Sequence, residues 1–243
     1  VMEENPVILG LSKDEDIPIV LENEAKVVFV LYGDLVRIGD IVHTLKEGGK
    51  LVFVNIDMVD GFAGRTSVVK FIKKNTAADG IISSKASLVR AAKEEGLYTV
   101  HRFFILDALA YRNIGKQLEI SRPDMINIVP GWPMVVQWAV EEHDRPVIAA
   151  GLVCDRQLVI ENLKAGANCY LQHESYGVGY VIYGYDSQSP TCALVALARF
   201  SPAPYGAKTA YVGGATASQS RFRPESKCFC ASTTRMLPGL KQL

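Results

Sequence analysis

The sequence lacks several features that would assign it to a specialised class of protein. No stretch approaches the ~18 consecutive apolar residues of a membrane-spanning helix, so we expect no membrane partner. Lysine plus arginine equals aspartate plus glutamate, at 26 each, which excludes the global basic field of a dedicated nucleic-acid binder. The first ten residues show no basic segment followed by an apolar one, so we expect no secretory signal and a cytoplasmic location.

Cysteine is also scarce, with five residues in the chain. Cys228 and Cys230 lack the companion histidine or cysteine spacing of a zinc site. We therefore expect unpaired thiols, and neither a metal nor a cofactor.

What the sequence does contain is a repeat of short β-branched runs. They start 18 to 29 residues apart, and most end at a turn-forming or polar residue that opens a stretch with helical periodicity. Near-continuous apolar strands separated by helices are typical of a parallel sheet covered on its faces. The runs are Val7–Leu11, Val27–Tyr32, Leu51–Asp57, Gly80–Ser84, Tyr98–Phe104, Met125–Gly131 and Pro146–Gly151, with an eighth starting at Asn168.

The segments between the runs fit amphipathic helices. Ile38, Ile41, Val42 and Leu45 follow the i, i+3, i+4, i+7 rule. A later helix opens at Pro133, and a last one has Asp155 as its expected N-cap. Eight such units predict an α/β protein with a closed (β/α)8 TIM-barrel-like fold, whose functional residues lie at the carboxyl ends of its parallel strands.

The chain is not uniform in composition. Residues 1–167 carry 19 basic and 23 acidic side chains, a balance of −4, whereas residues 168–243 carry 7 and 3, a balance of +4. The second segment holds four of the cysteines and only one weak helical run, at 193–200. We therefore expect a barrel domain at 1–172, followed at 173–243 by an atypical tail that is either disordered or translated out of frame.

Two carboxylates three residues apart follow the third predicted strand. Asp57 and Asp60 suit acid–base chemistry or cation binding, but Asp60-Gly61 is also ordinary turn chemistry. Asp34 follows the second strand in the same way. We expect Asp57, which is nearer the barrel, to have a functional role, and Asp60 a structural one.

Two basic residues belong to the fourth and fifth units. Lys85 just past a strand suits a Schiff base or an anion contact. Strand alternation puts His101 on one face and Arg102 on the other. A buried arginine needs a neighbouring carboxylate or a ligand phosphate, whereas His101 is expected to be structural.

Glycines mark the turns after the sixth and seventh strands. Gly131 follows one, and Gly151 lets the backbone approach a ligand after the other. In many barrels the loops after strands 7 and 8 hold a phosphate. Gly151 together with residues 165–167, which lead into the eighth strand, favours such a phosphate site.

Several strings in this sequence resemble the glycerol uptake operon antiterminator family. The resemblance covers about residues 5–167, and its motifs agree in order and spacing. They are VVFVLYGD (27–34), IVHTLKEGGKLVFVNID (41–57), DGIISSK (79–85), RFFILD (102–107), PDMINIVPG (123–131) and PVIAAGL with LKAGA (146–167). The resemblance implies a bacterial cytoplasmic protein that senses glycerol 3-phosphate and acts on leader messenger RNA so that transcription continues past a terminator.

A glycerol 3-phosphate site needs an anion cradle and polar partners for two hydroxyl groups. Gly151 and Leu152, with the strand-8 loop, would supply the cradle, and polar side chains at the barrel mouth would orient the polyol. The expected ligand-binding residues are Asp34, Asp57, Lys85, Arg102, Asn127, Gly131, Gly151, Leu152 and Ala167.

The chain also departs from the family pattern. Asn55 stands where the family usually has histidine, Asn127 where it has glutamate, and Ala150 where it favours glycine. From Asn168 onward the expected eighth-strand string is missing. One hypothesis is a reading-frame shift near codon 168, which would damage the eighth strand and open a barrel edge.

Three classes of function remain open. A regulator needs local basic patches for RNA, and we expect them at Lys70, Lys73, Lys74, Arg90 and Lys93, although solvated helix faces look the same. A TIM-barrel aldolase or isomerase acting on a small phosphorylated metabolite would use Lys85 or the Asp57/Asp60 pair. The third class is the non-functional product of a broken gene.

Overall fold

The chain folds into a closed barrel of eight parallel strands. The structure is a computed structural model that describes residues 6–153, 156–173, 180–182 and 194–197. Each strand pairs with the next in sequence, and β8 pairs with β1, which confirms the predicted (β/α)8 fold. The strands are β1 (Val7–Leu11), β2 (Val27–Val30), β3 (Leu51–Asn55), β4 (Gly80–Ser83), β5 (Tyr98–Phe104), β6 (Met125–Val129), β7 (Val147–Ala149) and β8 (Cys169–His173).

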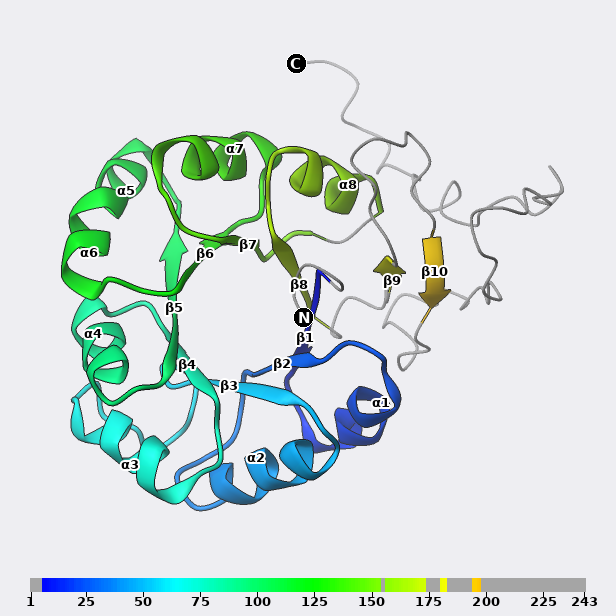
Figure 1. Cartoon of the computed structure of the whole chain (residues 1–243), viewed down its shortest axis with the longest axis vertical. Coiled ribbons are helices and arrows are strands. Elements are labelled where there is room, and N and C mark those ends of the chain that lie inside the picture. Colours follow the sequence, from blue (N-terminus) through cyan, green and yellow to red (C-terminus); the bar gives the residue numbers. More distant parts are fainter. Residues whose placement is uncertain (1–5, 154–155, 174–179, 183–193, 198–243) are drawn as a thin grey trace, which may run out of the picture.

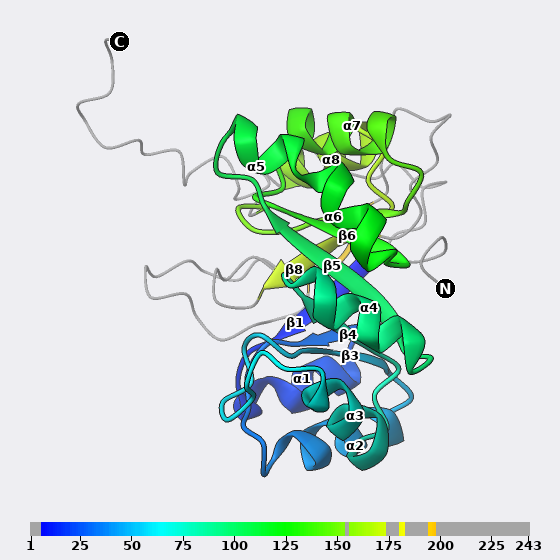
Figure 2. The same ribbon diagram turned by 90° about the vertical axis from the view of Figure 1, so that its left-hand side faces the viewer.

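Helices surround this ring on its outer side (Figure 1), and a side view shows α1–α4 on one half and α5–α8 on the other (Figure 2). The amphipathic pattern of α2 predicted its buried residues correctly: Ile38, Ile41, Val42 and Leu45. The helices are η1 (Asp14–Asp16), α1 (Ile17–Glu22), α2 (Ile38–Glu47), α3 (Ser67–Asn75), α4 (Ala86–Glu94), α5 (Ala108–Arg112), α6 (Ile114–Ser121), α7 (Pro133–Glu142) and α8 (Arg156–Lys164). The expected N-cap Asp155 lies outside the described residues.

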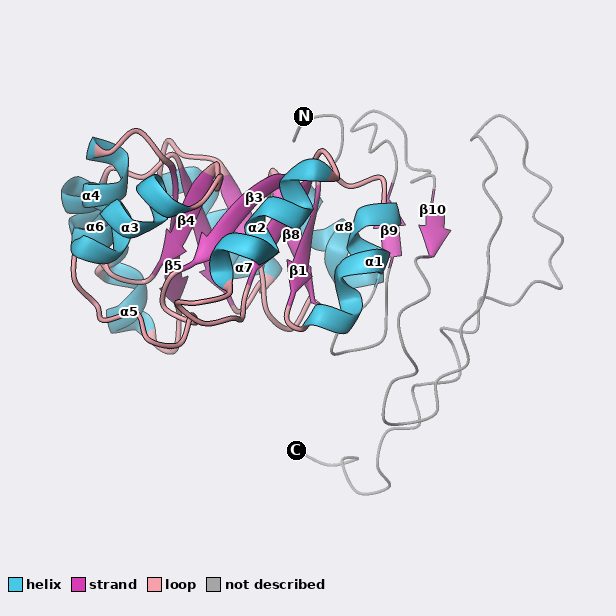
Figure 3. Ribbon diagram, turned by 90° about the horizontal axis from the view of Figure 1, so that it is seen from below, coloured by secondary structure: helices cyan, strands magenta, loops and turns pink. Residues whose placement is uncertain are grey.

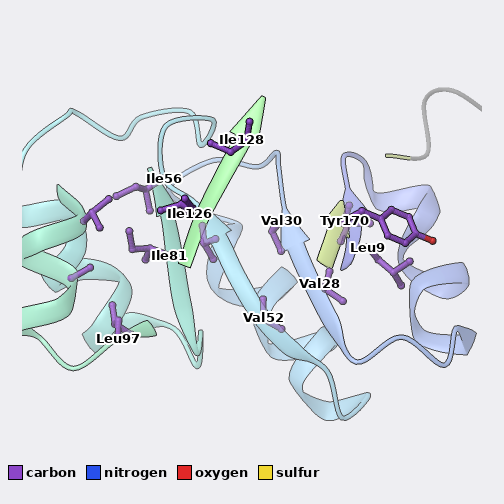
Figure 4. Close-up of a cluster of buried hydrophobic side chains, with 14 of the residues drawn as sticks. Leu9, Val28, Val30, Val52, Ile56, Ile81, Leu97, Ile126, Ile128 and Tyr170 are labelled. Carbon is purple, nitrogen blue, oxygen red and sulfur yellow. The ribbon is translucent and has the colours of Figure 1, made fainter. Parts of the chain in front are cut away.

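The apolar core has two layers. Side chains such as Ile8, Phe29 and Ile148 fill the inside of the ring. Others, including Leu9 and Ile126, pack between the ring and the helices, as Figure 4 shows. Strands buried on both faces in this way explain why the runs read as continuous apolar segments rather than as alternating ones.

Five strands end earlier than the sequence predicted, and β4 ends one residue early, at Ser83. β2, β3, β6 and β7 each end two residues before the predicted end, because the chain turns into a loop there. Asp57, Gly131 and Gly151 therefore lie in loops at the carboxyl end of the barrel rather than in the strand ladder.

The eighth strand is intact. Cys169 and Tyr170 are each 1% exposed, Leu171 is 6% exposed, and Figure 4 shows Tyr170 beside Leu9 of β1. The expected damage to this strand is therefore not found, because its side chains fill both core layers. The hypothesis of a reading-frame shift near codon 168 stays a prediction, since the burial of these side chains shows only that the strand packs in the barrel.

A repeated hydrogen bond at the amino end of the barrel supports the same conclusion. The residues just before β4, β6 and β8 are Asp79, Asp124 and Asn168. A side-chain oxygen of each accepts a backbone N–H near the start of the preceding strand, at Val52 (2.7 Å), Thr99 (2.9 Å) and Val147 (3.0 Å) respectively. Asn168 thus links two neighbouring strands at the amino end of the barrel, as Asp79 and Asp124 do.

Beyond the barrel, β9 (Tyr180–Ile182) and β10 (Leu194–Leu197) form a two-stranded antiparallel sheet (Figure 3). The helical run that the sequence suggested at 193–200 is therefore wrong for Leu194–Leu197, which is a strand. Cys228 and Cys230 lie outside the described residues. The domain division at 172/173 stays a prediction.

Candidate functional site at the carboxyl end of the barrel

Most of the predicted ligand-binding residues lie at one end of the barrel. Asp57 and Lys85 follow β3 and β4, Arg102 lies in the carboxyl-terminal half of β5, and Asn127 beside it is the middle residue of β6. Gly131 and Gly151 belong to the turns after β6 and β7. Because all eight strands are parallel, these positions share the mouth of the barrel.

Ala167 does not join this group. It precedes β8, so it lies at the amino end of the barrel, where its N–H donates to the Asn162 carbonyl (3.0 Å) and its side chain packs in the core. The sequence interpretation assigned the segment leading into β8 to the mouth, whereas only the loop after a strand reaches that end. The loop after β8 lies outside the described residues.

Asp57 is bound to the end of β4. Its Oδ1 accepts a hydrogen bond from Ser83 Oγ (2.9 Å), and its Oδ2 accepts from Ser84 N (2.6 Å) and Ser84 Oγ (2.8 Å). Three donors occupy most of the acceptor capacity of the carboxylate. Asp57 therefore fixes the β4 turn and adds a negative charge to the mouth.

Arg102 points inward from β5 and is half-buried. Burial lowers the pKa of the guanidinium, while the charge of Asp57 partly offsets that effect. Arg102 Nε donates to Asn127 Oδ1 (2.9 Å), and Nη1 lies 3.9 Å from Met58 Sδ. The neighbouring carboxylate that the sequence suggested is not its direct partner, since no ion pair among the described residues includes Arg102.

His101 faces the opposite way, as the alternation predicted. The side chain is 1% exposed, and its ring centroid lies 4.1 Å from that of Phe103. Burial lowers the pKa of His101 to about 4, so the ring is neutral near pH 7. Its Nε2 lies 3.3 Å from the Ser84 carbonyl, and its Nδ1 lies 2.9 Å from Ser121 Oγ, which itself donates to the Gln117 carbonyl (2.8 Å).

Lys85 is the N-cap residue of α4, and its side chain is exposed. Its Nζ lies so close to Gly64 that a Cβ added there would be 2.5 Å away. The ammonium group thus reaches the loop between β3 and α3, beside the turn that holds Asp57. It adds a positive charge to the mouth without the dry surroundings that a Schiff-base lysine needs.

Asp34 and Asp60 belong to a turn. Asp34 Oδ1 accepts from the backbone N–H groups of Val36 (2.8 Å) and Arg37 (2.9 Å), which is local capping. The main chains of Asp34 and Asp60 form an isolated parallel bridge. This geometry fits the expectation that Asp60 has a structural role. One carboxylate oxygen of Asp34, Oδ1, is already bonded within the same turn.

The turns after β6 and β7 are hydrogen-bonded to each other. Gly131 N donates to the Gly151 carbonyl (2.9 Å), and Asn162 Nδ2 donates to the Gly131 carbonyl (2.9 Å) from the buried face of α8. Gly151 has a φ of +67°, and a Cβ there would lie 2.9 Å from Val129 Cγ1. Leu152 also has a positive φ, of 57°. The positive φ and the close contact require glycine at position 151, and they fix the shape of these two turns at the barrel mouth.

Sequence reasoning missed four residues that shape the site: Asn55, Met58, Ser84 and Asn162. Asn55 is 2% exposed, and its Oδ1 accepts from the Asp57 backbone N–H (3.2 Å). A two-residue alternation counted back from Asp57 would have found it. No local pattern points to Asn162, which acts across 31 residues.

The predicted RNA-binding residues lie on the outer helices, away from the mouth. Lys70, Lys73 and Lys74 are exposed on α3. On α4, Arg90 pairs with Glu94 (3.0 Å) and Lys93 pairs with Asp124, so their charges are largely neutralised. The α3 lysines are therefore the stronger of the two candidate patches.

Two kinds of feature are missing from the part of the chain that the structure describes. None of its helices is long and apolar enough to cross a membrane. No group of three or more His, Cys, Asp or Glu side chains in these residues is arranged to hold a metal ion.

Comparison with known proteins points to one family. Residues 7–170 match the family model described as "Glycerol-3-phosphate responsive antiterminator". The uncharacterized protein YgcP of Escherichia coli (strain K12) is 39% identical over 166 residues, which is 68% of this chain and 87% of that protein.

Solved structures agree with this match. A glycerol uptake operon antiterminator regulatory protein from Listeria monocytogenes has a TM-score of 0.66 at 26% identity, covering 68% of this chain and 90% of that one. An antiterminator-related protein from Thermotoga maritima has a TM-score of 0.62 at 32% identity, covering 69% and 94%. Orotidine 5'-phosphate decarboxylase from Pyrococcus horikoshii, at 18% identity, shares the fold alone.

Proposed function

Because the chain belongs to the glycerol-3-phosphate responsive antiterminator family, we propose that it is a regulator that binds glycerol 3-phosphate at the barrel mouth. In this proposal the occupied protein acts in the cytoplasm on the leader messenger RNA of glycerol-utilisation genes, so that transcription continues past a terminator. The two steps are separate: the first concerns the mouth, and the second concerns a surface that contacts RNA.

The observation that best supports the ligand proposal is the environment of Arg102, namely its burial and its hydrogen-bonding partner. The Arg102 guanidinium is half-buried, has an amide as its partner and retains its full positive charge, and it forms no ion pair with a carboxylate among the described residues. Arg102 and Lys85 together place two positive charges at the carboxyl ends of β4 and β5, so that part of the mouth favours an anionic ligand. Asn55 and the exposed Ser84 offer hydrogen-bonding partners for hydroxyl groups.

Isothermal titration tests this proposal. We expect the wild-type chain to bind glycerol 3-phosphate at millimolar concentration or below, and Arg102→Gln to weaken binding by about tenfold or more, since a charge-assisted hydrogen bond to phosphate is lost. Arg145→Gln is the matched control, because it removes the same charge at the exposed amino end of β7 and leaves the mouth unchanged. Equal affinities in the three proteins would contradict the proposal.

For the RNA step, the exposed lysines of α3 are the proposed contact. They lie on the outside of the ring, so RNA bound there leaves the mouth open for the ligand. Phosphate contacts by such lysines give affinity rather than sequence specificity.

The alternative, a barrel aldolase or isomerase, has less support. Lys85 is exposed rather than desolvated, and Asp57 is already held by three donors from β4. Neither group is arranged to abstract a proton or to form an imine.

A further inference from the structure

Both functional groups of the Asn127 side chain are in use. The residue is fully buried on β6, and its Nδ2 donates to the backbone carbonyl of Ile148 (3.1 Å). A carbonyl accepts only from the NH2 end of the amide, so Oδ1 must face Arg102. The amide therefore has one orientation, and because the side chain is fully buried it does not reach a ligand in the mouth directly.

The consequence for Arg102 is that one edge of its guanidinium is fixed. Nε is held by Asn127 Oδ1 (2.9 Å), whereas the one acceptor near Nη1 among the described residues is the weak acceptor Met58 Sδ at 3.9 Å. The other charged groups near the guanidinium do not compete for the Nη groups. Asp57 is committed to Ser83 and Ser84, and Lys85 carries the same sign of charge.

We propose that Asn127 is a positioning residue that holds Arg102 by Nε and presents its two Nη groups to the phosphate oxygens of the ligand. This inference rests on the proposed function and sharpens it. The phosphate would lie against the β5 side of the mouth instead of on the Gly151 turn, to which the sequence pattern assigned it. The Gly151 turn would then contact the glycerol end.

The proposed arrangement also defines the class of ligand. A guanidinium that offers two parallel N–H groups matches a phosphate or carboxylate and gains little from a neutral hydroxyl. The site should therefore bind small phosphate monoesters and inorganic phosphate, and it should discriminate strongly against glycerol itself.

Substitution of Asn127 by aspartate tests the proposal with almost no change of shape. Asn127→Asp keeps the acceptor for Arg102, replaces the donor to the Ile148 carbonyl by an oxygen, and adds a charge that neutralises the guanidinium and repels an anion. We expect the affinities for inorganic phosphate and for glycerol 3-phosphate, both measured by titration calorimetry, to fall by the same factor of about ten or more. Asn75→Asp, which adds the same charge on exposed α3, should bind as the wild type does.

A second variant keeps the proposal testable if Asn127→Asp fails to fold. Arg102→Lys keeps the charge but removes Nε and the paired Nη groups, and we again expect both affinities to fall by about tenfold. Unchanged affinities in the two variants would overturn the inference. A fall for glycerol 3-phosphate alone, with inorganic phosphate unaffected, would also overturn it, because the pair would then contact the glycerol end.

The wild type separates this inference from the function on which it rests. If the wild type binds inorganic phosphate in an Asn127-dependent way but not glycerol 3-phosphate, the anion site stands and the proposed ligand is wrong. If it binds glycerol 3-phosphate and both variants bind equally well, the function stands and the positioning role is wrong. Binding of neither molecule would overturn both.

Discussion

Tyr170→Ala is expected to lower the free energy of unfolding by about 3–5 kcal/mol, the usual cost of truncating a large buried aromatic residue. Tyr170 is 1% exposed on β8 and packs in the layer between the ring and the helices, next to Leu9 of β1. The truncation leaves a cavity at the seam where β8 and β1 close the barrel. Urea denaturation followed by circular dichroism measures the effect.

Tyr98→Ala is the matched control, because Tyr98 also lies on a strand but is 63% exposed. We expect this change to stay within about 1 kcal/mol of the wild type. Equal stability losses in the two variants would mean that the eighth strand does not close the barrel. In that case the chain would depart from the family fold at residue 168 after all.

Acidification is expected to remove about 2–3 kcal/mol of stability between pH 7 and pH 4.5 through His101 alone. Burial lowers the pKa of this ring from 6.5 to about 4. At a pH between those two values the unfolded chain binds a proton that the folded chain does not. Stability is therefore fully present above pH 6.5 and declines as the pH falls toward 4.

The measurement is the urea midpoint at both pH values for the wild type and for His101→Gln, whose pH dependence should be smaller by that amount. His43→Gln is the control, because it makes the same replacement at an exposed histidine on α2. Asp124 does not interfere. Burial raises its pKa, but hydrogen bonds from Lys93 and Thr99 outweigh burial and hold it below 3.8, so it titrates below this range. Parallel curves for the wild type and His101→Gln would contradict a neutral buried ring.

The sequence predicted the fold well because strand burial leaves a strong local signal. The runs at Val7–Leu11 and Tyr98–Phe104 match β1 and β5 residue for residue. Strand ends were less predictable. Tyr32 was placed in its strand because it extends an apolar run, and Asp57 because it lies two residues after Asn55. The strands themselves end two residues earlier, at Val30 and Asn55.

The candidate site was predictable where it follows from alternation and topology. The opposite orientations of His101 and Arg102 follow from the two-residue period of a strand. The shared location of Asp57, Lys85 and Gly151 follows from parallel strands.

Long-range contacts were not predictable from local patterns. Asn127 was expected to touch the ligand, which stays a prediction, but its contacts with Arg102 and Ile148, which are distant in sequence, were not expected. Ala167 was assigned to the mouth because its glycine-containing string resembles a phosphate loop, yet it lies before its strand. Asn162 donates a hydrogen bond to the Gly131 carbonyl, and this contact forms because α8 packs against the turn after β6.

The central claim, a ligand-responsive regulator of transcription, is tested most directly by in vitro transcription of a glycerol-utilisation leader with and without glycerol 3-phosphate. The account predicts that the wild type raises read-through past the terminator only when the ligand is present. Arg102→Gln should lose this response, as should a variant with glutamine at Lys70, Lys73 and Lys74, which should still bind the ligand. Read-through that ignores the ligand, or no change on adding the folded protein, would contradict the account.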